Sequence, residues 1–194
     1  MTKGRPRSFD IEQALDAAIV TFWRQGYQAT SLNDLTDAMG INRPSMYAAF
    51  GDKEQLFLKA LDRYRQKFAG PIGAALKEDL DTKSAIALLL QRTVEVHTDT
   101  SLPRGCLIVN STLECCGWSD SLEQKLAEYH ALSEAAIYER LQQGLIEGEV
   151  ERDVDIRALA QFYNGVMQGM AVLAKVQMNP VMVRNIAETA MRAW

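Results

Sequence analysis

Apolar residues recur every three or four positions along most of the chain, and a glycine or a capping residue interrupts the pattern at short intervals. Ile11, Leu15, Ala18 and Phe22 keep this spacing up to Gly26. Residues spaced in this way share one face of an α-helix, whereas a half-buried strand requires alternation with a period of two. No stretch shows that alternation and no internal repeat is present, so the sequence predicts an all-α fold.

The ends of several helices are marked by local signals. Ser31 with Asp34, and Asp52 with Gln55, have the spacing of capping boxes. The segment "AGPIGAA" (69–75) contains the residues that interrupt helices, and it is the clearest domain boundary in the chain. The pattern as a whole predicts helices over 11–25, 31–39, 42–50, 52–68, 82–98, 105–116, 120–147, 155–177 and 180–193.

The charge is distributed unevenly along the chain. The net charge is −4, but residues 1–68 contain ten Lys and Arg against eight Asp and Glu, and the rest contains eleven against seventeen. Lys3, Arg5 and Arg7 carry the positive charge of the first seven residues, where no acidic residue is present. This asymmetry indicates a basic working face on an acidic body.

The sequence also indicates a compartment. No run of about eighteen uncharged apolar residues is present, and the N-terminus lacks an apolar signal segment, so we expect a cytoplasmic protein with no membrane contact. Three cysteines, two of them adjacent, do not form a disulfide framework, and reduced thiols are the expectation in that compartment.

Two short helices joined by a glycine turn form the most informative stretch. The predicted helices 31–39 and 42–50 are separated by Gly40-Ile41, which is the arrangement of a helix-turn-helix. Their apolar residues face the first helix and leave Arg43, Ser45, Tyr47 and Ala48 outward. An ordinary αα-hairpin is the alternative, but a second helix of two turns contributes little to a core. Its length suits a helix that presents its first turn to a DNA groove.

The outward residues have the chemistry for that role. Arg43 can donate to a guanine edge or to a phosphate, and the hydroxyls of Ser45 and Tyr47 can donate to phosphate. Pro44 stiffens the first turn and offers an apolar surface to a thymine methyl group. The basic start of the chain can follow phosphates or enter the minor groove as an arm, the alternative being a solvated tail.

Five short motifs follow one another in register over residues 8–57. The segment "ALDAAIVTFWRQGYQATSLNDLTDAMGINRPSMYAAFGDKEQLF" contains Phe-x-x-x-Gly-Tyr, Thr-Ser, Gly-Ile, Tyr-x-x-Phe and Lys-Glu-x-Leu. It closely resembles the DNA-binding domain of the TetR family of transcriptional regulators. We accordingly expect a basic arm and helix-turn-helix domain over 1–51, a connecting helix over 52–70, and a helical effector-binding and dimerisation domain over 71–194.

The resemblance implies roles for individual residues. Thr30 and Ser31 would contact phosphate, and Lys53 would grip the DNA backbone at the start of the fourth helix. The residues in or against the major groove would be Asn42, Arg43, Pro44, Ser45 and Tyr47. Many members carry histidine or another larger side chain after the tyrosine, where this chain has Ala48 and Ala49. Base readout here is therefore expected to depend more on Arg43, Pro44 and Ser45.

The resemblance further implies that the last two helices pair with a second subunit as a four-helix bundle. Apolar residues cover more than one face of the helix over 155–177, and Gly165 and Gly169 permit close approach of another helix. The alternative is that this helix is simply central in its own domain.

The stretch "RGCLIVNSTLECCGW" (104–118) suggests the trigger. Gly-Cys-Leu-x-x-Asn resembles a subset of the family, some of whose members respond to electrophiles through that cysteine. A thiol in a first helical turn lies near unsatisfied amides, which lower its pKa, and Arg104 adds a cation. Cys106 is therefore the candidate sensor, with a buried core residue as the alternative. The other candidates for a pocket for a small apolar ligand, which could equally be plain core, are Asn110, Trp118, Tyr163 and Met167.

Other functions fit the sequence less well. Adjacent Cys115 and Cys116 point about 100° apart on a helix, and neither His97 nor His130 has ligand spacing to them, so no metal is expected. No catalytic motif is present, and no cofactor is expected. We expect a dimeric, ligand- or redox-responsive repressor of a palindromic operator. An activator on the same fold, or a helical interaction module without specific DNA binding, are the alternatives.

Overall fold

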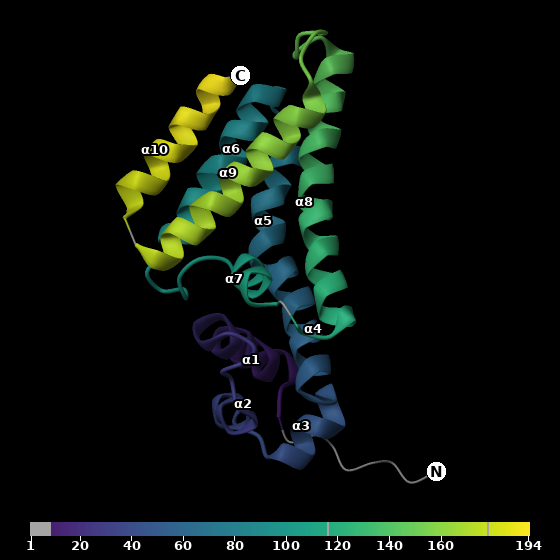
Figure 1. Cartoon of the computed structure of the whole chain (residues 1–194), viewed down its shortest axis with the longest axis vertical. Coiled ribbons are helices and arrows are strands. Elements are labelled where there is room, and N and C mark those ends of the chain that lie inside the picture. The colour runs from purple at the N-terminus through teal and green to yellow at the C-terminus, as the bar shows by residue number, and fades with distance from the viewer. Residues whose placement is uncertain (1–8, 116, 178) are drawn as a thin grey trace. The chain divides into compact units, whose positions relative to one another are not determined.

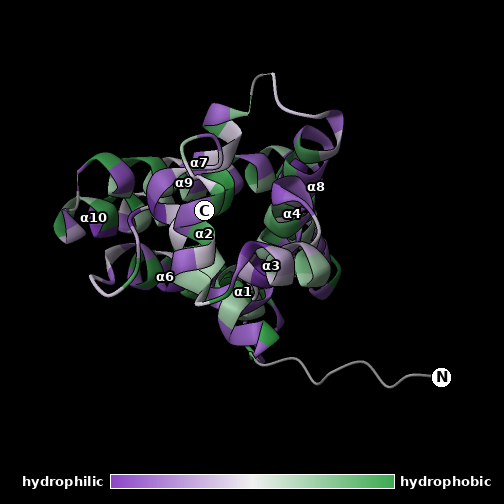
Figure 2. Cartoon of the chain, turned by 90° about the horizontal axis from the view of Figure 1, so that it is seen from below, coloured by the Kyte–Doolittle hydropathy of each residue, from purple (hydrophilic) through white to green (hydrophobic). Residues whose placement is uncertain are grey.

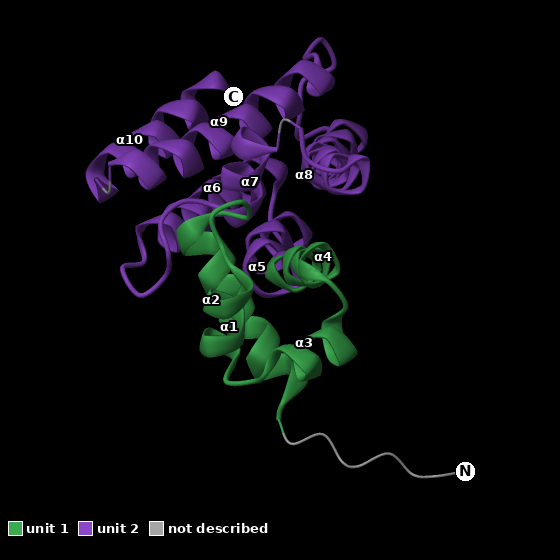
Figure 3. Cartoon of the chain, turned by 60° about the horizontal axis from the view of Figure 1, so that its bottom comes forward, with its two compact units in different colours: residues 1–64 green, residues 65–194 purple. Residues whose placement is uncertain are grey.

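The structure is a computed structural model, and it describes residues 9–115, 117–177 and 179–194. Within these ranges every regular element is a helix and no strand occurs, which confirms the predicted all-α class (Figure 1). The chain divides into two compact units, Met1–Tyr64 and Arg65–Trp194, which Figure 3 shows in different colours. Among the described helices, none combines the length and the apolarity that a bilayer crossing requires.

The first unit consists of α1 (Ile11–Gln25), α2 (Leu32–Met39), α3 (Arg43–Phe50) and α4 (Lys53–Tyr64). The predicted capping boxes are present. The Asp34 N–H donates to Ser31 Oγ over 3.1 Å and the Ser31 N–H donates to the Asp34 carboxylate over 2.8 Å. Asp52 and Gln55 exchange the equivalent pair of bonds before α4. These reciprocal bonds satisfy amides that a helix start leaves unpaired, and they fix where both helices begin.

Aromatic side chains form the centre of this unit. The rings of Phe22 and Phe57 meet edge to face at 4.8 Å between centroids, and those of Trp23 and Tyr64 do so at 4.9 Å. Both pairs join α1 to α4, and all four rings are buried. Such pairs add about 0.5–1.5 kcal/mol each to the burial of their area. Helix α1 and helix α4 therefore form a firm base against which the two short helices pack.

The segment predicted to break the helix does not do so. A π-helical turn, η1 (Arg65–Ala69), follows α4, and then come α5 (Gly70–Gly73) and the 3₁₀ turn η2 (Ala74–Lys77). Pro71 has no N–H to donate to the preceding turn, and it lies where the π-helical turn gives way to α5. Ile72, Ala75 and Leu76 are buried in the core of the second unit, so tertiary packing outweighs the poor helix propensity of this segment. The prediction of a breaker at 69–75 is wrong.

The second unit continues with α6 (Thr82–Thr98), α7 (Leu107–Glu114), α8 (Asp120–Glu147), α9 (Ile156–Val176) and α10 (Pro180–Ala190), followed by η3 (Met191–Ala193). Helix α7 begins two residues later than predicted. Green hydrophobic and purple hydrophilic residues both occur on α9 and α10 in Figure 2, as in amphipathic helices. The core between the helices is lined by buried residues that include Ile86, Leu90, Ile137, Leu141, Tyr163 and Met170.

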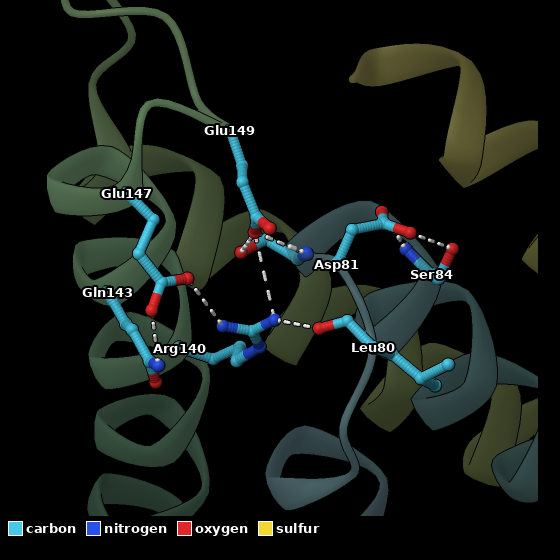
Figure 4. Close-up of polar contacts among 8 residues, drawn as sticks. Leu80, Asp81, Ser84, Arg140, Gln143, Glu147 and Glu149 are labelled. Carbon is cyan, nitrogen blue, oxygen red and sulfur yellow. Dashed lines mark hydrogen bonds and ion pairs between the residues drawn. The ribbon is translucent and has the colours of Figure 1, made fainter.

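A buried arginine joins the end of α8 to the start of α6 (Figure 4). The Arg140 side chain is 6% exposed, and its Nη2 donates to the Leu80 carbonyl. Its guanidinium lies 3.9 Å from the Glu147 carboxylate and 3.8 Å from that of Glu149. Glu149 also accepts bonds from the Thr82 N–H and hydroxyl, over 2.8 and 2.6 Å, and these bonds lower the pKa of its carboxyl group. We call these five residues the Arg140 cluster.

Candidate functional site

Helices α2 and α3 form the predicted helix-turn-helix. Helix α2 ends at Gly40, whose φ of 65° is left-handed and suits a residue without a Cβ atom. After Ile41, Asn42 is the N-cap of α3, and its Oδ1 accepts a 2.9 Å hydrogen bond from the Ser45 N–H. The inward side chains Leu35, Met39, Met46 and Phe50 are all buried. Their burial determines the direction in which the opposite face of α3 points.

The opposite face of α3 is open to solvent. Arg43, Pro44 and Ala48 are exposed, the Tyr47 side chain is 47% exposed, and Ser45 is half-buried. An exposed tyrosine of this size has no role in the core, and its hydroxyl can donate to a phosphate. The Arg43 guanidinium donates from Nη2 to Asn33 Oδ1 over 2.8 Å, so a residue of α2 holds it. Asn33 was not among the residues predicted from the sequence.

The two residues before α2 have different environments. Ser31 is exposed, and its oxygen accepts the Asp34 amide while its own O–H remains able to donate to a phosphate. Thr30 is only 1% exposed, and its hydroxyl donates to the Gly26 carbonyl over 2.6 Å. The Thr30 side chain therefore stabilises the turn after α1 and is not presented to solvent.

Lys53 lies at the first position of α4 and faces the turn between α1 and α2. Its Nζ donates to the Gln28 carbonyl over 3.4 Å and lies 4.6 Å from the centre of the Tyr27 ring. Partial burial lowers the pKa of its ammonium group and raises the pKa of the Tyr27 hydroxyl. These contacts place a cation beside the turn that precedes α2. The predicted arm residues Lys3, Arg5 and Arg7 lie outside the described residues.

In the second unit, Cys106 occupies the N-cap of α7 instead of its first turn. Its backbone is extended, its side chain makes no capping hydrogen bond, and it is half-buried. Just before it, Gly105 has a left-handed φ of 74° and is tightly packed, because an added Cβ would lie 3.0 Å from the Ala171 carbonyl oxygen. The Asn110 side chain donates to the Arg104 carbonyl over 3.3 Å and thereby holds the same loop. The thiol therefore sits at a constrained helix start.

His97, for which the sequence predicted no role, is buried and lies against this loop. His97 is 6% exposed, and burial lowers its pKa to about 4, although a hydrogen bond with the Gly105 backbone raises it in part. His97 is thus neutral at physiological pH. Its Nδ1 is buried without a hydrogen-bond partner among the described residues. The sequence shows only a histidine near the end of an apolar helix, which does not distinguish this environment from a solvated one.

The remaining pocket candidates belong mainly to the core. Tyr163 is fully buried, its hydroxyl donates to the Ala190 carbonyl over 3.5 Å, and burial raises its pKa to about 12. Trp118 is 9% exposed, and Met167 is half-buried against the core of the second unit. Cys115 donates from its thiol to the Thr112 carbonyl over 3.2 Å. Within the described part of the chain, no three His, Cys, Asp or Glu side chains are grouped as a metal site would need.

Helices α9 and α10 carry an exposed apolar face. Phe162, Leu173, Val176 and Val181 are 38–76% exposed. A cleft of about 550 Å³ opens between the two helices, and Phe162, Val166, Val181 and Ile186 contribute to its lining. Gly165 and Gly169 are exposed on α9, and a Cβ added to either would meet nothing within 4 Å. We call this surface the α9–α10 face.

Known families and proteins match the chain over most of its length. A family model described as "Bacterial regulatory proteins, tetR family" matches residues 14–60, and one described as "Tetracyclin repressor-like, C-terminal domain" matches residues 82–190. The HTH-type transcriptional repressor ComR of Escherichia coli (strain K12) is 36% identical over 194 residues, which are 100% of this chain and 92% of that protein. The repressor BdcR of the same organism is 30% identical over 173 residues, 89% of this chain and 82% of BdcR.

Solved structures match equally well. A cysteine mutant of the TetR family transcriptional regulator CifR, complexed with 26 bp double-strand operator DNA, superposes with a TM-score of 0.93. It is 37% identical and covers 98% of this chain and 100% of its own. A TetR transcriptional regulator from Chloroflexus aurantiacus J-10-FL has the same fold, with a TM-score of 0.84 at 24% identity over 93% of this chain and 91% of its own.

Proposed function

Because the chain belongs to the TetR family of bacterial transcriptional regulators, we propose that it is a repressor that binds operator DNA as a homodimer and leaves it in response to a small molecule or electrophile. The observation that carries the proposal is the exposed face of α3, opposite a fully buried one. Full-length similarity to ComR, which is named a repressor, and to operator-bound CifR supports it. A helical module without DNA contacts would not need Arg43 and Tyr47 exposed on so short a helix.

In this proposal the DNA-contacting residues divide into three groups. Ser31, Lys53 and the N-terminal amides of α2 and α3 bind phosphates and set the position of the protein on the duplex. Thr30 would contact a phosphate through its backbone, because its side chain is buried. Asn42 at the N-cap of α3 and the α3 residues Arg43, Pro44, Ser45 and Tyr47 lie in or against the major groove, and Arg43 is the main reader of a guanine edge. Lys3, Arg5 and Arg7 act as an arm along the phosphates or in the minor groove.

The α9–α10 face is the proposed dimer interface. Apolar side chains with this exposure are costly on a monomer surface, and two glycines four residues apart allow a partner helix to approach closely. Two copies joined here would form a four-helix bundle from α9 and α10 of each subunit. Two tethered α3 helices would then read a near-palindromic operator whose half-sites lie about one helical turn apart.

The proposed response begins at the start of α7. An electrophile that modifies Cys106, or an apolar ligand held near Asn110, Trp118 and Met167, would alter the junction of α6, α7 and α9. Tyr163 packs in the core instead, where its hydroxyl is bonded to the Ala190 carbonyl of α10. A coupling on the order of 1–3 kcal/mol between this region and DNA binding is enough for release.

The proposal is tested by selecting binding sites from random duplex DNA with the full chain. We expect a near-palindromic consensus, and a binding constant that falls steeply with salt. Deleting residues 2–7 should weaken binding to all duplexes and reduce that salt dependence. Equal affinity for all duplexes would overturn the proposal. Transcription in vitro from a promoter that contains the selected site distinguishes repression from activation.

A further inference from the structure

The hydrogen bond between Arg43 and Asn33 crosses from one helix of the helix-turn-helix to the other. Arg43 is the first residue of α3 and Asn33 the second residue of α2, ten positions earlier. Both side chains are exposed, and Nη2 and Oδ1 lie 2.8 Å apart. A solvated arginine occupies many rotamers, so a bond to a neighbouring helix restricts the directions in which its guanidinium can point.

Asn33 has no evident duty in the fold. The start of α2 is already secured by Ser31 and Asp34, and the buried residues of the helix are Leu35, Thr36 and Met39. The bond from Arg43 is the one that the Asn33 side chain makes among the described residues. The Asn33 side chain is therefore not needed for the stability of the fold. It contacts Arg43, which is the exposed residue of α3 that is proposed to contact a base.

An asparagine suits this position chemically. Its Oδ1 accepts one N–H of the guanidinium and leaves the others for an acceptor in the groove, such as guanine O6 and N7. Because the amide is neutral, it does not cancel the charge of Arg43 as a carboxylate would. Asn33 can therefore orient the guanidinium of Arg43 and leave its positive charge available to DNA.

We propose that Asn33 is a positioning residue, which holds Arg43 in the direction that reads a single guanine in each half-site. This inference rests on the proposed function. Without Asn33 the guanidinium reaches neighbouring acceptors, including phosphates, and the protein loses preference at one base pair while it keeps its general affinity for DNA.

The test compares binding of full-length variants to the selected operator and to three operators that differ only at the base pair read by Arg43. Asn33→Ala should reduce the preference at that pair about three- to tenfold, the range of one hydrogen bond. Arg43→Ala should reduce it about five- to 150-fold. Adding Asn33→Ala to Arg43→Ala should change the preference no further. Asn33→Asp, which can accept the same bond, should retain the preference although its charge weakens binding to every duplex.

Several outcomes would contradict the inference. Asn33→Ala could leave the preference unchanged or sharpen it, its effect could add to that of Arg43→Ala, or Asn33→Asp could lose the preference as fully as Asn33→Ala does. Thermal unfolding of each variant should match that of the wild type, because the replaced side chain is exposed. If the wild type shows no sequence preference at all, the proposed function fails before the role of Asn33 arises.

Discussion

At the scale of single residues, the two groups beside the start of α7 differ in their chemistry. His97 is buried and neutral, and it contacts the backbone of the loop that ends at Cys106. Cys106 is half-buried at the N-cap, where the amides of the first turn of α7 have no helical partner. One group is thus a buried neutral imidazole, and the other is a half-buried thiol at a helix start.

The stability of the protein should fall on mild acidification because of His97. An unfolded chain takes up a proton at this residue near pH 6.5, whereas the folded chain does so only near pH 4. The free energy of unfolding is therefore highest above pH 6.5 and should drop by roughly 3 kcal/mol as the pH falls to 4. Urea denaturation of the wild type and of His97→Gln between pH 7 and pH 4.5 measures this dependence. If both proteins lose stability equally over this range, His97 is not buried in its neutral form.

Cys106 should react with a maleimide before Cys115. The thiol of Cys115 donates to a carbonyl group at the far end of the helix, whereas Cys106 lies beside the amides at its start. Mass spectrometry of partly labelled protein identifies the modified residue, and operator release is measured in the same samples. Cys106→Ser should stay on the DNA after treatment. Equal release of both proteins would instead favour a reversible ligand as the trigger.

At the scale of helices and turns, short-range signals determined most of what could be predicted. The capping boxes at Ser31 and Asp52 and the stop at Gly40 involve residues within four positions of one another, so they could be read directly. The helical turns over 65–77 depend on Ile72, Ala75 and Leu76 packing against helices far along the chain, which no local pattern reveals. The same holds for the candidate site. The exposed face of α3 could be predicted from local spacing, whereas the environments of Asn33 and His97 depend on tertiary contacts.

The Arg140 cluster should contribute strongly to stability. Arg140 is buried, and its partners Leu80 and Glu149 lie 60 and nine residues away. The loss of its side chain removes the hydrogen bond between α8 and the segment before α6, and it leaves the Glu149 carboxylate without its cation. We expect Arg140→Met to lower the free energy of unfolding by about 2–4 kcal/mol. Arg152→Met, at an exposed position of the next turn, should change it by less than about 0.5 kcal/mol. Equal urea midpoints for the two variants would show that the cluster is dispensable.

At the scale of the whole molecule, the α9–α10 face should decide the oligomeric state. A Cβ added at Gly169 meets nothing within 4 Å, so the subunit should fold normally with a leucine there, but the larger side chain would separate two helices that pack across an interface. We expect Gly169→Leu to be monomeric in light scattering and to bind the operator at least a hundredfold more weakly, because each half-site loses its tethered partner. Ala131→Leu, on an exposed part of α8, is the matched control. An intact dimer of Gly169→Leu would place the interface elsewhere.

The separation of the buried and exposed faces of α3 has a consequence for how the DNA sequence preference of such a regulator evolves. Met46 and Phe50 hold the helix in the fold, whereas Arg43, Pro44, Tyr47 and Ala48 contribute little to the core. Substitutions at exposed positions usually alter stability by less than about 0.5 kcal/mol. A new DNA sequence preference can therefore arise by replacing outward side chains one at a time, without compensating changes in the interior. The same independence makes this helix a practical place to install a chosen operator preference by design.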